Sequence, residues 1–238
     1  MNLKYCTCLC FLVASWLHVS AQDESLQQLA DSYAAEYLAY VSKHAVIFSG
    51  VEQQSLPYVT RNHSYFNKQT FQSGRLSYNG VIYPEVLLRW DLYKDELIIF
   101  SPVISSLILK KENVDYIEIY GYHIFPLDTD SLPGCPAAGY YSLLHSGNCM
   151  VIERKNATLQ WNDEDGLRNY YFTFSSTFYL RKDGVYHKIK NKNSLLKHMA
   201  THRKDLNRLI RSYGLRFKTN AETIIVGVVK EYEKLMCQ

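Results

Sequence analysis

Apolar and polar positions alternate most clearly between residues 74 and 102, in GRLSYNGVIYPEVLLRWDLYKDELIIFSP. The dipeptide Asn79-Gly80 accepts the positive φ angles of a tight hairpin turn. A second turn at residues 93–96 returns the chain as another apolar strand. Pro84 cannot donate to a ladder, which predicts a bulge or an edge position in the second strand. The segment is therefore predicted to form an antiparallel meander.

Similar short runs continue to residue 189, separated by turn signals such as Ser146-Gly147-Asn148 and Asp183-Gly184. The further predicted strands span residues 45–48, 107–110, 116–120, 122–127, 140–145, 150–154, 170–174, 177–180 and 185–189. About ten short strands joined by tight turns favour an antiparallel sheet that is curved or partly closed.

Helical spacing of apolar residues occurs at both ends of the chain. It predicts an N-terminal helix over residues 25–41, with Ser25 as its cap. Near the other end, Ser194 is predicted to cap a helix that stops at Gly214, and Asn220 opens a second helix. The sequence thus predicts an α+β fold with one domain over 22–238, in which the sheet covers about 45–190 and the C-terminal helical part about 193–236.

Residues 1–21 have the pattern of a cleavable signal peptide. Lys4 precedes an apolar run, and Val19-Ser20-Ala21 supplies small residues before the expected cleavage site. The run is too short and too interrupted for a membrane span, which needs roughly 20 apolar residues. We therefore expect an exported, non-membrane-spanning chain in the periplasm, associated with the outer membrane or secreted.

Cleavage would leave three of the six cysteines, Cys135, Cys149 and Cys237. An oxidising compartment allows one disulfide, and Cys135 with Cys149 is the close pair. A hairpin at 146–148 turns Cys149 away from Cys135 unless the loop at 133–138 folds back. The sequence leaves both a Cys135–Cys149 disulfide and unbonded thiols open.

Charge is distributed unevenly along the chain. Residues 181–218 contain twelve Lys and Arg against Asp183 and Asp205, a local net charge of +10, although the whole chain carries only +3. Nucleic acid is a poor partner for an exported protein without a recognisable binding module. The predicted basic interaction surface, suited to an acidic partner, consists of Lys197, Arg203, Lys204, Arg208 and Arg211.

Candidate chemistry is sparse. His198 and His202 have the i, i+4 spacing of helical metal ligands, but no catalytic Glu stands between them and His202 falls on the apolar stripe, so a structural role is favoured. No phosphate loop or nucleophile elbow occurs. The sequence therefore predicts no catalytic, cofactor-binding or metal-binding residue. A pair of carboxylates for glycoside hydrolysis is defined by distance and cannot be recognised at this level.

Three segments together resemble a group of exported Bacteroidetes proteins with no established activity. They are GRLSYNGVIYPEVLLRWDLYKDELII, GYYSLLHSGNCMVIERK and GVYHKIKNKNSLLKHMATHRKDLNRLIRSYGLRF. The shared features are a Tyr-Asn/Asp-Gly turn, a Gly-Tyr-Tyr hairpin, a Gly-x-Tyr strand and a Ser-Leu-Leu helix rich in Lys and Arg. The resemblance implies a Gram-negative envelope or secreted location.

Three hypotheses of function follow. The first is a non-enzymatic binding or accessory module whose tyrosine-rich sheet and basic helix meet an envelope protein or a glycan. Twenty tyrosines in 238 residues are compatible with this surface, and equally with a sheet that covers itself with tyrosine. The second is a periplasmic carrier of a lipid or another apolar ligand. The third is a polysaccharide-acting hydrolase.

Overall fold

The computed structural model describes residues 32–33, 46–101, 105–128, 133–164 and 166–237. The chain divides into two compact units, residues 1–49 and residues 50–238, which are described separately. The signal peptide predicted over 1–21 lies outside the described residues, as does the helix predicted over 25–41 apart from Ser32 and Tyr33. Within the first unit, Val46–Phe48 forms a 3-10 helix, so the strand predicted over 45–48 is wrong.

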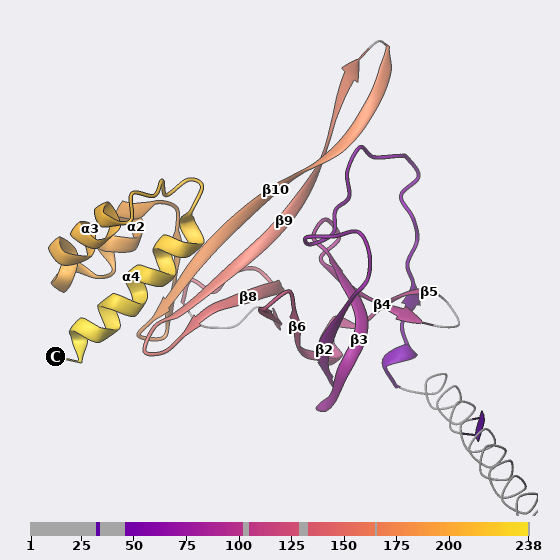
Figure 1. The fold of residues 1–238 in the computed structure, drawn as a ribbon, viewed down its shortest axis with the longest axis horizontal. Coiled ribbons are helices and arrows are strands. Elements are labelled where there is room, and N and C mark those ends of the chain that lie inside the picture. Colours follow the sequence, from indigo (N-terminus) through magenta and orange to yellow (C-terminus); the bar gives the residue numbers. More distant parts are fainter. Residues whose placement is uncertain (1–31, 34–45, 102–104, 129–132, 165, 238) are drawn as a thin grey trace, which may run out of the picture. The chain divides into compact units, whose positions relative to one another are not determined.

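The second unit is dominated by one antiparallel sheet of eleven strands in the order β1-β5-β4-β3-β2-β6-β7-β8-β9-β10-β11 (Figure 1). The strands are β1 (Val51–Glu52), β2 (Gln72–Tyr78), β3 (Val81–Asp91), β4 (Glu96–Ser101), β5 (Ser105–Ile108), β6 (Val114–Ile119), β7 (Tyr122–Leu127), β8 (Gly139–Ser146), β9 (Met150–Glu164), β10 (Leu167–Lys182) and β11 (Val185–Ile189). The helices are α2 (Lys192–Lys197), α3 (Arg203–Ser212) and α4 (Ala221–Met236), with 3-10 turns at Lys111–Asn113 and Ala200–His202.

The predicted α+β class is wrong, while the N-terminal helix predicted with it falls almost entirely on residues outside the described ones. Strands carry most of the described fold, and the helices form a small group at the C-terminal end of the sheet. The strands are not all short either, because β9 and β10 have 15 and 16 residues. The predicted breaks after Arg154 and at Ser175 do not occur, since β9 and β10 pair continuously along their length.

Turn chemistry was predicted correctly from the sequence. The β2–β3 hairpin turns at Asn79 and Gly80, whose φ angles are 51° and 73°. The β10–β11 hairpin turns in the same way at Asp183 and Gly184. The register of β2 and β3 shifts where Pro84 lies, which confirms the predicted bulge.

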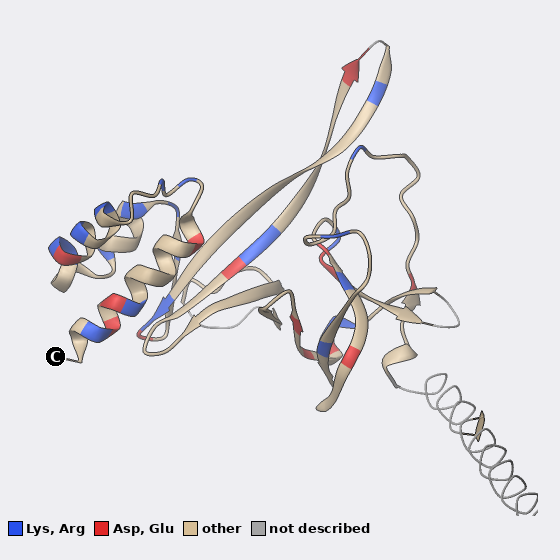
Figure 2. Cartoon of the chain, in the orientation of Figure 1, with Lys and Arg blue, Asp and Glu red and all other residues tan. Residues whose placement is uncertain are grey.

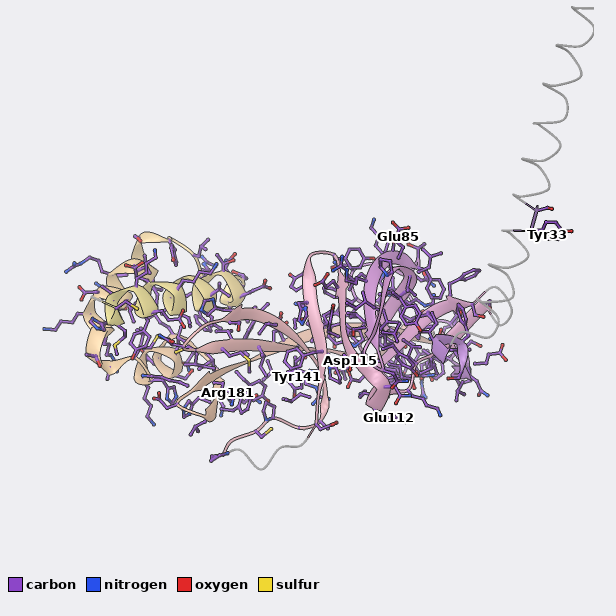
Figure 3. All side chains as sticks on the ribbon, turned by 90° about the horizontal axis from the view of Figure 1, so that it is seen from below. Tyr33, Glu85, Glu112, Asp115, Tyr141 and Arg181 are labelled. Atoms are coloured by element: carbon purple, nitrogen blue, oxygen red, sulfur yellow. The ribbon has the colours of Figure 1, made fainter. Side chains whose placement is uncertain are left out.

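The C-terminal helices cover one face of the sheet through a continuous apolar cluster. Alternate residues of the strands face it, including Val151, Phe178 and Leu180, and the helices contribute the buried side chains Leu195, Leu196, Met199, Leu206, Ile210, Ile224, Ile225, Val228, Val229 and Tyr232. Figure 3 shows side chains filling the space between α4 and the strands. Each fully buried Leu, Ile or Val contributes about 1.5–3 kcal/mol of transfer free energy, so this cluster fixes the helices against β9 and β10.

The predicted helix over 194–213 is divided in two. Asn191, not Ser194, is the cap of α2, since its side chain accepts from Ser194 N while the Ser194 side chain accepts from the Asn191 backbone. The chain then turns at Met199, which is buried, before α3 begins. The helix expected after Asn220 is confirmed as α4, with Asn220 as its cap residue.

Candidate functional site

A groove of about 950 Å³ lies between the strands and the start of α4. Tyr122 of β7 and Glu153 and Lys155 of β9 line it, together with residues 174–178 of β10. Its other walls are residues 188–190 at the end of β11 and residues 217–223, which lead into α4. We call this feature the charged groove, because Lys and Glu side chains from several elements meet there.

Glu153 is the most unusual residue of the charged groove, since only 1% of its surface is exposed. Strand alternation places Val151, Glu153 and Lys155 on one face of β9, and Val151 packs in the helix-covered cluster. Lys155 Nζ lies 2.7 Å from Glu153 Oε2. The ammonium approaches without the alignment of a hydrogen bond, so that oxygen keeps no hydrogen-bond partner among the described residues. A buried carboxylate with spare acceptor capacity costs stability, which makes a structural role alone a poor explanation.

Aromatic rings hold Lys155 over this carboxylate. The Lys155 ammonium lies 5.5 Å from the ring centroid of Phe66 and 5.1 Å from that of Tyr122. Phe66 in turn makes edge contacts with Trp90, Tyr120 and Tyr122. Attraction between a cation and the ring faces therefore fixes the ammonium beside Glu153.

A second carboxylate enters the charged groove from the first turn of α4. The Tyr122 hydroxyl donates a long hydrogen bond to Glu222, with an oxygen separation of 3.4 Å. Burial raises the pKa of Glu222, and the nearby charge of Glu153 adds to this, although Lys155 and the Tyr122 hydrogen bond oppose it. Burial, followed by the charges of Glu222 and Glu153, also raises the pKa of Tyr122. Perturbed titratable groups gathered in a hollow are typical of functional sites.

This pKa shift leads to a prediction about pH. Because the folded state raises the pKa of Glu222, ionising this group at neutral pH weakens the folded protein, and the penalty disappears below its ordinary value near 4.5. We expect Glu222→Gln to raise the thermal unfolding midpoint at pH 7 and to have little effect at pH 4. Thermal melts of both proteins across this range test it. Equal midpoints at every pH would contradict the raised pKa.

Positive charge exceeds negative charge around the charged groove. Four lysines line it, namely Lys155, Lys188, Lys190 and Lys218, against Glu153 and Glu222. The last three of these lysines are exposed. Among the described residues none of the three forms an ion pair, whereas Lys155 is bound to Glu153. The charged groove thus offers unengaged ammonium groups to a ligand.

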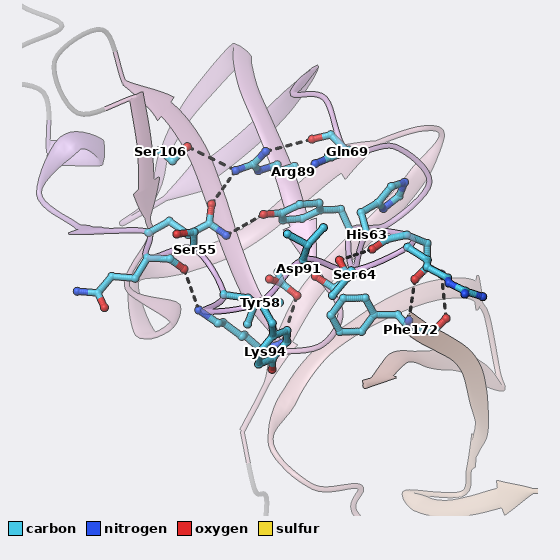
Figure 4. A pocket seen from close by; sticks show the side chains of 18 residues that line it. Ser55, Tyr58, His63, Ser64, Gln69, Arg89, Asp91, Lys94, Ser106 and Phe172 are labelled. Atoms are coloured by element: carbon cyan, nitrogen blue, oxygen red, sulfur yellow. Dashed lines mark hydrogen bonds between the residues drawn. The ribbon is translucent and has the colours of Figure 1, made fainter. Parts of the chain in front are cut away.

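A second hollow, of about 740 Å³, lies between residues 53–69 and strands β3 and β10 (Figure 4). Its polar groups are largely bonded to one another. Arg89 lies between the rings of Tyr65 and Phe71 and donates to Gln53 Oε1 at 2.7 Å. Asn62 bonds both the N–H and the carbonyl of Phe172. These contacts hold the 53–69 segment against the sheet, so we interpret this hollow as structural.

The five residues of the predicted basic interaction surface lie on or beside α2 and α3, and all five are exposed. Figure 2 shows Lys and Arg spread over these helices. One of them, Arg208, faces Asp205 at 3.7 Å. The surface is separate from the charged groove, whose lysines come from β9, from the end of β11 and from the segment before α4.

The other residues singled out in the sequence are placed apart. Cys149 packs beneath the helices, while Cys135 packs with Tyr141 on the opposite face, and the structure contains no disulfide between them.

His198 stacks on His187 with ring centroids 3.9 Å apart, and His202 packs against Tyr232 instead. The turn at Met199 separates the two histidines that helical spacing had placed on one face. No group of three or more His, Cys, Asp or Glu among the residues described could hold a metal.

No family model, curated protein or solved structure matches the chain. The resemblance to exported Bacteroidetes proteins therefore stays a prediction, and so does the export signal. None of the described helices has the length and apolar character needed to cross a membrane.

None of the four groups at the centre of the charged groove is among the residues that the sequence singles out, namely Tyr122, Glu153, Lys155 and Glu222. The sequence contains one signal that Glu153 is buried, because residues 151 and 153 lie on the same face of a strand and Val151 is apolar. No local signal exists for the contact between Tyr122 and Glu222, which are 100 residues apart. Only the packing of α4 against the sheet brings them together.

Proposed function

We propose that this chain is a non-enzymatic binding or accessory module of the cell envelope, and that the charged groove is its binding site for an anionic ligand. The observation that carries this proposal is the excess of lysines over glutamates along the groove, three of them exposed and without an acidic partner in the described structure.

A polysaccharide-acting hydrolase is the second candidate, because two carboxyl groups line the same groove. The side chain of Glu153 is only 2% exposed and lies against Lys155, which leaves it poorly placed to reach a sugar or a water. Release of new reducing ends from an acidic polysaccharide, lost in Glu222→Gln, would favour the hydrolase. The lysines also fit a charged ligand better than the apolar cargo of a lipid carrier.

Binding of a short oligo-glutamate peptide, measured by calorimetry beside a matched oligo-glutamine peptide, tests the proposal. We expect the acidic peptide alone to bind, with an affinity that falls as salt rises. Replacing Lys188, Lys190 and Lys218 by Gln should weaken binding roughly 10-fold, since exposed ion pairs contribute about 0.5 kcal/mol each.

The matched control removes the same charge elsewhere, by replacing the exposed lysines Lys68, Lys110 and Lys230 by Gln. This control should bind the acidic peptide as the unaltered protein does. Equal losses in the two triple variants, or no binding by the unaltered protein, would overturn the assignment of the charged groove.

A further inference from the structure

One edge of β10 is open along the wall of the charged groove. Residues 167–181 of this strand pair with β9 on one side. On its other side, β11 pairs with residues from Phe178 to Lys182, and residues 60–62 bond to Tyr170 and Phe172. Residues 173–177 lie between these two partners, and no strand of the described chain pairs with them on that side.

The hydrogen bonds of the neighbouring residues show in which direction the backbone N–H and C=O groups of residues 173–177 point. Arg61 N donates to the carbonyl of Tyr170, and the Asn62 side chain bonds both backbone groups of Phe172, so these residues direct their polar groups away from β9. Alternation along a strand extends this direction to Phe174 and Ser176. Their N–H and C=O groups therefore face outward and have no hydrogen-bond partner in the described structure.

The open edge results from the path of the chain after β11. Ile189 is opposite Phe178, and the next residues leave the sheet to begin α2 at Lys192. A strand that continued the line of β11 would pair with Phe174 and Ser176. Five residues of extended chain span roughly 17 Å, enough to fill the gap. Both residues are exposed, so the approach from solvent is open.

The charges beside the open edge of β10 indicate which kind of peptide segment would bind to it. Lys188 and Lys190 stand where β11 ends, and Lys155 and Lys218 line the same groove. We propose that an extended acidic segment of a partner protein binds by adding a strand to β10 at Phe174 and Ser176, antiparallel to β10 and in line with β11. Backbone hydrogen bonds would supply affinity and the lysines would select acidic side chains. This inference rests on the proposed function of the charged groove.

The test uses a peptide of alternating Glu and Val and two N-methylated versions of it. In one phase every second residue is N-methylated, and in the opposite phase the remaining residues are. An added strand turns the N–H groups of only one phase toward β10. Methylation in that phase should weaken binding about 10-fold or more through the lost hydrogen bonds, and methylation in the other phase should change it little. Equal affinities for the two methylated peptides would overturn strand addition.

A substitution in the protein gives an independent readout. Ser176→Pro removes an outward N–H that the β9 ladder does not use, and circular dichroism should show the fold unchanged. Ser176→Pro should weaken binding of the Glu-Val peptide about 10-fold. Ser176→Ala keeps the N–H and should bind this peptide as the unaltered protein does. If Ser176→Pro does not fold, the methylated peptides still decide.

The outcomes separate the two proposals. Binding of oligo-glutamate that depends on the lysines but is unaffected by Ser176→Pro or by methylation phase would refute strand addition and leave the anionic site standing. A concentration-dependent dimer in sedimentation that Ser176→Pro abolishes would identify a second copy of this chain as the occupant and overturn the acidic partner.

Discussion

Replacing Lys155 by Ala is expected to lower the free energy of unfolding by about 3–5 kcal/mol, the usual cost of removing one member of a buried ion pair. Lys155 lies 2.7 Å from Glu153 Oε2, and the two side chains are only 14% and 2% exposed. The substitution would leave the Glu153 carboxylate without its counter-charge under the groove. Urea unfolding followed by tryptophan fluorescence measures the change.

Two further variants show whether this loss of stability comes from the buried charge of Glu153. Lys188→Ala removes an exposed lysine from the same groove and should change stability by less than about 0.5 kcal/mol. Combining Glu153→Gln with Lys155→Met removes both charges and should recover much of the lost stability, because a buried pair is often replaceable by neutral groups of similar size. A loss below about 1 kcal/mol in Lys155→Ala would show that Glu153 is not buried as the structure has it.

Replacing Phe66 by Ala is expected to cost about 3–5 kcal/mol of stability and also to weaken binding of the acidic peptide. The Phe66 ring is 7% exposed and makes edge contacts with Trp90, Tyr120 and Tyr122, so its removal leaves a cavity among aromatic rings. The same ring lies beneath the Lys155 ammonium. Its loss therefore removes one of the contacts that position the charge of the groove.

Phe66→Leu separates the two effects of this ring. Leu fills much of the volume, so stability should fall less than in Phe66→Ala, but it offers no ring to the ammonium. We expect both variants to bind the acidic peptide more weakly than the unaltered protein. Unchanged affinity in both variants would mean that Lys155 does not depend on the aromatic cluster for its position.

The parts of the fold that the sequence predicted are those decided by a few adjacent residues. Asn79-Gly80 and Asp183-Gly184 adopt positive φ angles because of their own chemistry, whatever surrounds them. Likewise Pro84 produces its bulge because it has no N–H to donate. Such features do not depend on distant parts of the chain.

The errors occur where distant contacts decide the structure. The sequence predicts separate strands over 170–174 and 177–180, yet β10 continues through Ser175 and Ser176 because β9 pairs with every residue there. The helix expected to run on to Gly214 turns at Met199, since Leu195, Leu196 and Met199 are all buried in one cluster. The charged groove depends on the same long-range packing, because β7, β9 and α4 each supply only part of it.

NMR chemical-shift mapping of the isotope-labelled protein, as the oligo-glutamate peptide is added, tests directly whether the charged groove is the binding site. We expect the largest shifts in the charged groove, in residues 174–178, in Lys188 and Lys190, and in the first turn of α4. The exposed basic residues of α2 and α3, Arg203 and Arg208 among them, should move little. Shifts concentrated on those helices instead, or no shifts at all, would contradict the charged groove as the binding site.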